Sequence, residues 1–297
     1  MPFVGEEKLK KVKKSWMRPR IVDFLNSTCN TSIFHYVIPI GTIVYVLAMI
    51  VVMWVFVKRC EKSKLSTYHT LGASIYAMLC GIIGARLFYI LQHLDRILDN
   101  PIQILSLGGG TASWGAYFGG SIGFIFYLYL KKLDILTYFD VLFSAVGLGP
   151  FIGRWACFLN GCCFGTVTKL PWGVRFPKFS SAYNSHLKLN LINESSLLSL
   201  PVHPVQIYSS LFTFALFILA SIFWHKFKGY KGLTVIFYLF LYSIIRFFIE
   251  FLRGDVPRYT SLAFTFSQII CLVIIIVSLI VTGFKYHEIT LRARSRI

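Results

Sequence analysis

Residues 33–57 read IFHYVIPIGTIVYVLAMIVVMWVFV, and His35 is the only Asp, Glu, Lys, Arg or His among them. An α-helix rises 1.5 Å per residue, so about 20 apolar residues cross the ~30 Å hydrocarbon core of a bilayer. The run is too long for the apolar region of a signal peptide, although basic residues crowd the chain before it. It therefore predicts a transmembrane helix.

Six further apolar runs follow, and each predicts another span: residues 71–91, 114–130, 136–158, 205–224, 233–252 and 262–284. Hydrophobic residues make up 56% of the chain and charged residues 14%. Soluble domains carry about 25% charged residues, so the composition excludes an ordinary soluble enzyme, a coiled coil and a disordered chain. We predict an all-α membrane protein with seven transmembrane helices and one long extramembrane segment between the fourth and fifth helices.

Three regions follow from this pattern: a basic N-terminal tail (1–32), a seven-span membrane domain (33–284) whose segment 159–204 is external, and a basic C-terminal tail (285–297). The net charge is +18. In a soluble protein such an excess suggests nucleic acid, but in a membrane protein it suggests anionic lipid and the loop charges that set topology. We therefore expect membrane lipids as partners and no nucleic acid.

The basic residues also predict the orientation, because cytoplasmic loops are enriched in Lys and Arg. With the N-terminus outside and the C-terminus in the cytoplasm, most of the loop charge is cytoplasmic: Lys58, Arg59, Lys62, Lys64, Lys131, Lys132, Lys226, Lys228, Lys231, Lys285, Arg292, Arg294 and Arg296. The basic residues of the N-terminal tail oppose this orientation, but most of them lie too far from the first span to count strongly. Segment 159–204 then faces the exterior.

Five ionisable residues fall within or at the ends of the predicted spans: Arg86, Asp140, Arg154, Arg246 and Glu250. A charge at the centre of a transmembrane helix costs at least about 2.5 kcal/mol on insertion scales, so it needs a partner or a water-filled cavity. Near a helix end, an arginine can instead extend to the interface. That simpler explanation suits Arg86 and Arg154 better than Arg246.

Arg246, Glu250 and Arg253 lie one turn apart and share a helix face. One carboxylate does not neutralise two guanidinium groups, so the sequence predicts a cationic stripe. Guanidinium groups bind phosphate well, and a lipid phosphate is the abundant anion of a membrane. A lipid-head-group site is favoured here over a purely structural ion pair.

The densest motif is GRWACFLNGCCFG, residues 153–165, in which Arg154 supplies a cation. Its cysteines, with His203, suggest a metal site, but their spacing is unusual for zinc and adjacent cysteines rarely fit one tetrahedron. We therefore predict that Cys157, Cys162 and Cys163 are structural and that no metal or cofactor is bound. The motif HPVQIY opens the fifth span and places His203, Gln206 and Tyr208 at its start.

Together these motifs resemble the prolipoprotein diacylglyceryl transferase family over nearly the whole chain. The resemblance rests on six ordered features: GARLFY at 84–89, the glycine-rich stretch 108–120, Asp140, the 153–165 motif, His203 to Tyr208, and Arg246 to Arg253 followed by Ser267-Gln268. It implies transfer of the diacylglyceryl group from phosphatidylglycerol to the lipobox cysteine thiol of a preprotein, which is lipoprotein biosynthesis in the bacterial cytoplasmic (inner) membrane.

The resemblance also implies roles for particular residues. It gives Arg154, Arg246, Glu250 and His203 as candidate catalytic residues, with His203 and Glu250 as alternative bases for the thiol. Substrate-binding candidates are Arg154, Arg86, Arg246, Arg253, Gln206, Tyr208, Gly109, Gly110 and Trp114.

Several positions depart from the family pattern. Members of the family often carry His where this chain has Trp114, and Asn and Glu where it has Cys157 and Cys162. The family's first-span tyrosine is not placed by the sequence, and Tyr36 is one candidate. Two alternatives therefore stand beside the transferase: a relative of the same fold that uses another acceptor, and a non-catalytic lipid-binding membrane protein. A redox pair of Cys162 and Cys163 is a third and weaker alternative, because a vicinal disulfide is strained.

Overall fold

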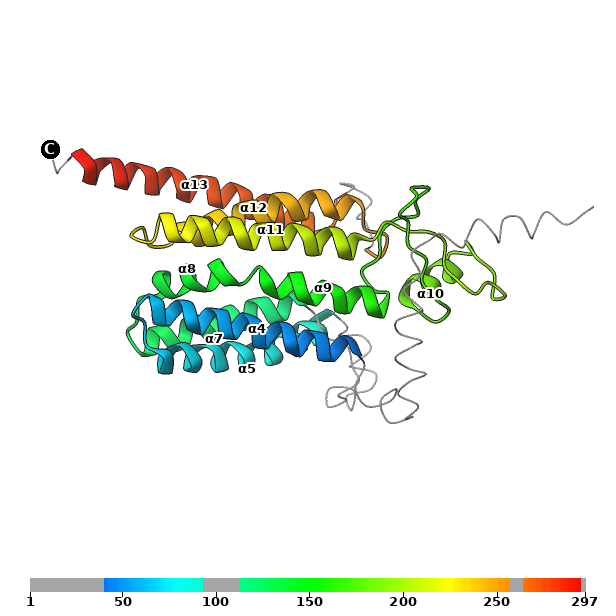
Figure 1. The fold of residues 1–297 in the computed structure, drawn as a ribbon, viewed down its shortest axis with the longest axis horizontal. Coiled ribbons are helices and arrows are strands. Elements are labelled where there is room, and N and C mark those ends of the chain that lie inside the picture. Colours follow the sequence, from blue (N-terminus) through cyan, green and yellow to red (C-terminus); the bar gives the residue numbers. More distant parts are fainter. Residues whose placement is uncertain (1–39, 93, 95–112, 257–263, 295–297) are drawn as a thin grey trace, which may run out of the picture. The chain divides into compact units, whose positions relative to one another are not determined.

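The computed structural model describes residues 40–92, 94, 113–256 and 264–294. These residues form helices and isolated β-bridges and contain no β-strand (Figure 1). The helices are α4 (Ile40–Lys62), α5 (Thr67–Gln92), α7 (Ser113–Leu130), α8 (Ile135–Ala145), α9 (Leu148–Asn160), α10 (Ser181–Lys188), α11 (Val205–Lys226), α12 (Leu233–Phe251) and α13 (Phe266–Arg294). The prediction of an all-α membrane protein is confirmed.

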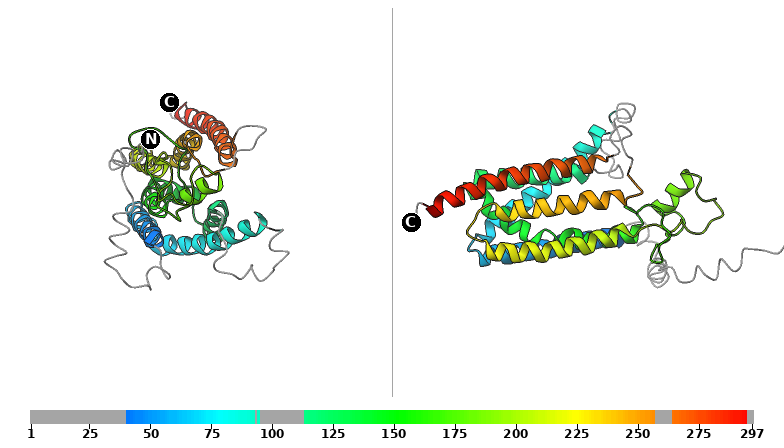
Figure 2. Two further views of the ribbon diagram at one scale, coloured as in Figure 1. Left: turned by 90° about the vertical axis from the view of Figure 1, so that its right-hand side faces the viewer. Right: turned by 90° about the horizontal axis from the view of Figure 1, so that it is seen from above.

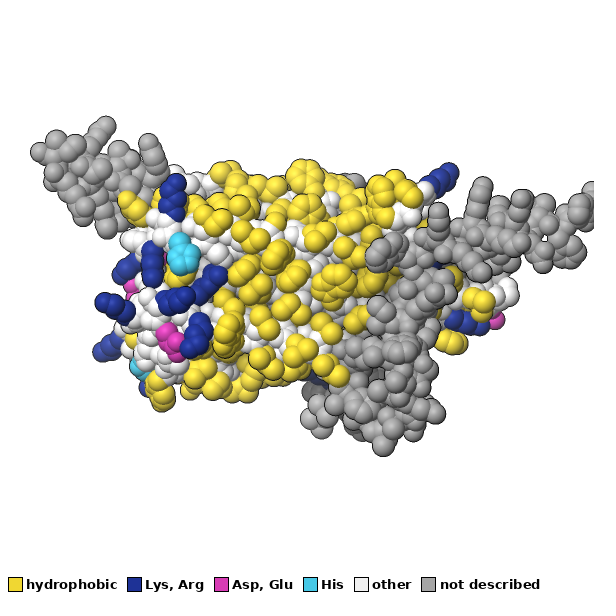
Figure 3. Space-filling view, viewed as in Figure 1, with side chains coloured by type: hydrophobic (Ala, Val, Ile, Leu, Met, Phe, Trp, Pro, Cys, Tyr) yellow, Lys and Arg dark blue, Asp and Glu magenta, His cyan; other side chains and the backbone are white. Residues whose placement is uncertain are grey.

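Five of the described helices are long and apolar enough to cross a membrane: α4, α5, α11, α12 and α13. The pair α8 and α9 makes a sixth span if it is counted as one, and α7 is apolar but shorter. The exposed flanks of these helices carry Ile, Leu, Val and Phe, as lipid-facing surfaces require (Figure 3). The protein is therefore a multi-pass membrane protein.

The predicted fourth span, 136–158, is not one straight helix. It consists of α8 and α9, which are bent by 44° at Val146-Gly147. Pro150 explains the break, because it has no N–H to donate to the Val146 carbonyl and its ring crowds that carbonyl. The amide of Gly149 bonds the Val146 carbonyl instead, at 3.0 Å.

The chain divides into two compact units. The second unit comprises Met53–Leu142 and Gly229–Gly232 and contains the closely packed pair α5 and α7. Glycines allow this approach, because a Cβ added at Gly119 would lie 3.0 Å from the Gly84 Cα and one added at Gly115 would collide with the Gly84 carbonyl. Gly115, Gly119 and Gly123 recur every four residues and so form one smooth face of α7 that lets α5 approach closely.

Asp140, one of the ionisable residues predicted inside a span, is also in the second unit. Its carboxylate is buried on α8 and accepts a hydrogen bond of 2.6 Å from the Gly232 amide. Nearby, Lys231 forms an ion pair with Asp134. Asp140 therefore stabilises the loop before α12, which accounts for a charge within the helix.

The first unit comprises Met1–Val52, Phe143–Lys228 and Leu233–Ile297. Helix α11 packs on α9 and α12, and α13 runs along α12, as Figure 2 shows. Between α11 and α12, Leu216, Ala220 and Tyr238 form an apolar core. The Ser210 hydroxyl donates to the Phe151 carbonyl at 2.8 Å and joins α11 to α9.

Segment 159–204, also in the first unit, is a small folded region rather than an open loop. Its core consists of Phe164, Val174, Phe176, Ala182 and Val202. Antiparallel bridges pair Val202 with both Val167 and Val174, and the Ser180 side chain caps α10. This packing fixes the chain on either side of the motifs at 153–165 and 203–208.

Candidate active site

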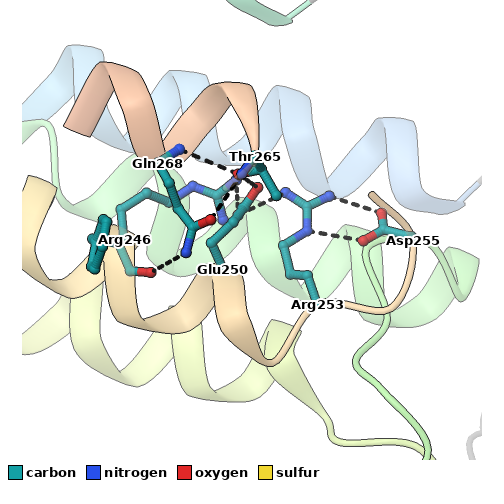
Figure 4. Close-up of polar contacts among 7 residues, drawn as sticks. Arg246, Glu250, Arg253, Asp255, Thr265 and Gln268 are labelled. Carbon is teal, nitrogen blue, oxygen red and sulfur yellow. Dashed lines mark hydrogen bonds and ion pairs between the residues drawn. The ribbon is translucent and has the colours of Figure 1, made fainter. Parts of the chain in front are cut away.

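Helix α12 ends in a cluster of charged side chains (Figure 4). Arg246 Nη2 lies 2.7 Å from Glu250 Oε2, and Arg253 Nη1 lies 3.5 Å from the same oxygen. The Thr265 hydroxyl donates to Glu250 Oε1 at 3.1 Å. The Glu250 side chain is 0% exposed, so these three partners are what makes its burial tolerable.

Arg253 has a second carboxylate partner that the sequence interpretation missed. Its Nε and Nη2 donate to the two carboxylate oxygens of Asp255, at 2.9 and 2.8 Å. Burial opposes the charge, but Asp255 and Glu250 outweigh it and raise the pKa of Arg253 above its usual value. The α12 cluster therefore has two cations and two anions. The expectation of a net-cationic stripe is corrected, because the chain leaves the helix after Phe251 and brings Asp255 back to Arg253.

Thr265 and Gln268 connect the start of α13 to this cluster. The Thr265 amide donates to Gln268 Oε1 at 2.9 Å, and the Gln268 amide donates to Thr265 Oγ1 at 3.2 Å. This is a capping box, with a hydroxyl residue and Gln three positions apart. Gln268 Nε2 also donates to the Phe247 carbonyl at 3.3 Å. The box thus holds the Thr265 hydroxyl against Glu250.

Arg154 on α9 restores the positive charge of the site. It is half-buried and lies within electrostatic range of Arg253, Tyr242, Cys157 and Cys163. Among the described residues, no carboxylate is within ion-pair distance of it. Three arginines therefore stand against two carboxylates, and one positive charge is left for an anionic ligand.

Backbone hydrogen bonds bring three distant motifs together at Gly165. The Gly165 amide donates to the His203 carbonyl at 3.1 Å, and the Gly254 amide donates to the Phe164 carbonyl at 3.0 Å. A Cβ at Gly165 would lie 2.6 Å from the His203 carbonyl oxygen. Only glycine allows this approach, and it places His203 beside the end of α12.

Five buried side-chain polar atoms in the first unit have no hydrogen-bond partner among the described residues. They are Arg246 Nη1, His203 Nδ1, Gln206 Oε1, Ser243 Oγ and Glu250 Oε2, and the last of these is held by ion pairs. Buried polar groups are nearly always paired, so such atoms are candidates for binding a ligand or water. Gln206 Nε2 donates to the Cys162 carbonyl at 2.8 Å, which fixes the amide. The Tyr208 hydroxyl accepts a hydrogen bond from Trp172 Nε1 at 2.8 Å.

The three cysteines of the 153–165 motif lie together. Their sulfur atoms are all within 4.8 Å of one another. The Tyr45 hydroxyl on α4 lies 2.8 Å from Cys157 Sγ. Tyr36, the first-span tyrosine suggested by the sequence, is outside the described residues.

The remaining predicted substrate-binding residues lie in the second unit or outside the described residues. Arg86 is on α5 in the second unit, with its guanidinium 5.6 Å from the Tyr89 ring centroid. Gly109 and Gly110 lie outside the described residues, as does the side chain of Trp114.

Sequence reasoning missed Tyr45, Asp255 and Thr265. The T-x-x-Q spacing of Thr265 and Gln268 is a capping-box signal that precedes an apolar run and would have placed Thr265. Asp255 follows Arg253 by two residues, but only the loop conformation pairs them. Tyr45 is one of several aromatic residues in its span, and no local pattern distinguishes it.

The fold and this site define a multi-pass helical membrane protein with an arginine-rich cluster suited to an anionic group. A model of the prolipoprotein diacylglyceryl transferase family matches residues 31–283. The chain belongs to this family.

Curated relatives agree with that assignment. The chain is similar to a phosphatidylglycerol--prolipoprotein diacylglyceryl transferase of Clostridium tetani, with 37% identity over 75% of this chain and 84% of the relative. It is 32% identical to such a transferase, numbered 2, of Clostridium perfringens, over 77% of this chain and 84% of that protein. A third relative, of Finegoldia magna, is 30% identical over 79% and 85% of the two chains.

Proposed function

We propose that this chain transfers the diacylglyceryl group of phosphatidylglycerol to the cysteine thiol of prolipoproteins. The observation that carries the proposal is the family match across residues 31–283, which takes in every motif of the site. The chain matches the curated relatives over most of their length, and those relatives are named for this reaction. The chain is thus a transferase of lipoprotein maturation.

The charges of the site support a role in stabilising the leaving group. A thiolate sulfur bonds to a glyceryl carbon, the carbon–oxygen bond breaks, and glycerol phosphate leaves with the electron pair. Arg154 lacks a carboxylate partner among the described residues, and Arg246 Nη1 lacks an acceptor there. Both can donate to phosphate oxygens, and a preorganised cation stabilises the developing charge most strongly where water is scarce.

Of the two candidate bases, we favour His203 over Glu250. Both Glu250 oxygens are already engaged, by Arg246, Arg253 and Thr265. Its role is to position the two arginines. His203 Nδ1 has no partner among the described residues, so it is available to accept the thiol proton.

The proposal extends to substrates and placement. Gln206, Tyr208, Arg253, Arg86, Gly109, Gly110 and Trp114 contribute to substrate binding, and the acceptor cysteine belongs to a lipobox. The membrane domain 33–284 crosses the bacterial inner membrane seven times between the two basic tails. The N-terminus and segment 159–204 face the exterior, and the C-terminus faces the cytoplasm.

The decisive experiment incubates the purified protein with phosphatidylglycerol and a lipobox peptide in vesicles. Mass spectrometry should show the peptide heavier by one diacylglyceryl group, with an equal amount of glycerol phosphate released. A peptide with serine in place of the cysteine should not react. Activity should rise between about pH 7 and 9, because a thiol with an ordinary pKa near ~8.5 ionises over that range.

An active relative such as the Clostridium tetani transferase serves as the positive control. If the control converts the peptide while this chain binds phosphatidylglycerol without turnover, the transferase proposal is rejected. A non-catalytic lipid-binding protein then remains. Consumption of phosphatidylglycerol with no modified peptide would point to another acceptor.

A further inference from the structure

The cysteines of the 153–165 motif are brought together by the way α9 ends. Gly161 adopts a left-handed conformation with φ of 67°, and the Cys162 amide bonds back to the Cys157 carbonyl at 3.1 Å. Cys163 is also left-handed, with φ of 55°, which is uncommon for a residue with a side chain. The chain therefore curls back over the last helical turn instead of leaving it.

From this arrangement, we propose that Cys157, Cys162 and Cys163 bind one divalent thiophilic metal ion of the Zn²⁺ or Cd²⁺ type. Their sulfurs lie within 4.8 Å of one another. Zinc–sulfur bonds of about 2.3 Å in a tetrahedral site place sulfurs about 3.8 Å apart. The sulfurs need to close by about 1 Å or less. The cysteine spacing alone is unusual for zinc, but the left-handed residues Gly161 and Cys163 turn the chain back and bring the sulfurs together.

The surrounding charges favour a divalent ion. Three thiolates and one divalent cation leave a single negative charge, and Arg154, which interacts electrostatically with Cys157 and Cys163, balances it in place of a lipid phosphate when the metal is bound. A monovalent ion would leave a second negative charge in a partly buried site, where an uncompensated charge is costly. The charge balance therefore selects a divalent soft metal.

The fourth coordination position and the entry path are also present. The Tyr45 hydroxyl, 2.8 Å from Cys157 Sγ, either donates to that thiolate or supplies an oxygen ligand. Cys162 and Cys163 are half-buried, so an ion can reach them. On binding, the three thiols release three protons to solvent. The metal site rests on the cysteine geometry, the nearby Arg154 and the Tyr45 hydroxyl, and it does not depend on transferase activity.

The test is titration of the purified, fully reduced full-length protein with Cd²⁺. Thiolate-to-cadmium charge-transfer absorption should saturate at one ion per chain, and Cd²⁺ should displace bound Zn²⁺, because the softer cadmium ion binds thiolate more tightly. Replacing Cys162 with serine (Cys162→Ser) should weaken binding by more than about tenfold, the scale on which even outer partners of metal ligands act. Tyr45→Phe should weaken it less.

The matched control is Cys271→Ser, because Cys271 is a buried free thiol that belongs to no group of three potential metal ligands among the described residues. This variant should bind as the parent does. The proposal is overturned if the parent shows no saturable absorption, or if Cys157→Ser, Cys162→Ser and Cys163→Ser all bind with the parent's affinity. Size-exclusion profiles and melting curves identify any variant that fails to fold, and the remaining single variants then decide the question.

Discussion

The two terminal nitrogens of the Arg246 guanidinium group differ in their hydrogen-bond partners. Nη2 pairs with Glu250 at 2.7 Å, whereas Nη1 is buried with no hydrogen-bond partner among the described residues. An arginine can hold its structural partner and a ligand at once, because its donors are arranged in a planar fork. A lysine ammonium is a point charge, and it cannot reproduce that geometry.

We therefore expect Arg246→Lys to reduce turnover nearly as much as Arg246→Ala. The loss should be on the order of 10²-fold, as for other single donors to a transition state. The measurement is diacylglyceryl transfer to a lipobox peptide at saturating phosphatidylglycerol. Arg175→Lys, in segment 159–204 and outside the charged cluster, is the control and should keep parental activity. Full turnover in Arg246→Lys would refute the fork model.

A second prediction concerns the close backbone contact between Gly165 and His203. A Cβ there would collide with the His203 backbone, whereas one at Gly229 would meet nothing within 4 Å. Gly165→Ala should shift His203 away from the end of α12 and lower both activity and the melting temperature. Gly229→Ala should change neither. Equal behaviour of the two alanine variants in activity and melting assays would show that the junction does not position His203.

Among single residues, regular helical spacing was the part that the sequence could predict. Arg246 and Glu250, four positions apart, pair as expected. The Asp255 partner of Arg253 could not be predicted in this way, because it depends on a loop conformation. The close approach of the three cysteine sulfurs could not be predicted either, because it requires left-handed backbone at Gly161 and Cys163.

At the scale of elements, apolar periodicity placed most of the described helices within a few residues. It missed the bend between α8 and α9 and the continuation of α13 to Arg294, beyond the predicted end at 284. Helix α11 begins at the predicted Val205, and α12 ends one residue before the predicted end of its run. The break between α8 and α9 was not predicted, because hydropathy does not depend on whether a residue such as Pro150 has a backbone N–H. The fold of segment 159–204 was not predicted either, because its core residues are far apart in the sequence and form no local pattern.

Helix α10 provides a pH-dependent prediction. The buried His186 accepts a hydrogen bond from the Leu200 amide through Nδ1 at 3.2 Å, and burial lowers the pKa of His186. The unfolded segment therefore binds the proton more readily than the folded one. The stabilisation is fully present above the unfolded pKa of about 6.5 and is lost as the pH falls below it.

Limited proteolysis of segment 159–204 should accordingly be faster at about pH 5.5 than at about pH 7.5, measured with a protease active at both. His186→Gln keeps a hydrogen-bond acceptor but does not titrate, so its cleavage rate should lose most of this difference. His225→Gln, an exposed histidine, should behave as the parent. An unchanged pH difference in His186→Gln would assign the effect to another group.

At the scale of the whole molecule, composition was sufficient to predict a helical membrane protein, and ordered motifs were sufficient to predict its family. The number of crossings is harder to predict, because it depends on whether the shorter α7 and the bent pair α8–α9 each cross the bilayer.

The positions of the basic loop residues provide evidence on the number of crossings. In the second unit, His69 Nδ1 lies 3.2 Å from the Tyr127 hydroxyl, so the start of α5 and the end of α7 share one end. The turns that carry Lys64 and Lys131 are therefore on the same side of the second unit, as the positive-inside rule would require of two cytoplasmic turns.

Cysteine labelling in intact cells tests both the orientation and the count. Lys64→Cys and Asn193→Cys place exposed thiols in the α4–α5 turn and in segment 159–204. If α5, α7 and the α8–α9 pair each cross once, three crossings separate these positions, and they lie on opposite sides. A membrane-impermeant maleimide should label Asn193→Cys at once and Lys64→Cys only after permeabilisation, with the parent chain measured alongside for its native cysteines. Labelling of both positions from the same side would mean that the bent pair α8–α9 does not cross, because the start of α5 and the end of α7 already share one end. The reverse pattern would keep an odd number of crossings between these positions and invert the protein, which would place the 153–165 motif and its arginine on the cytoplasmic side.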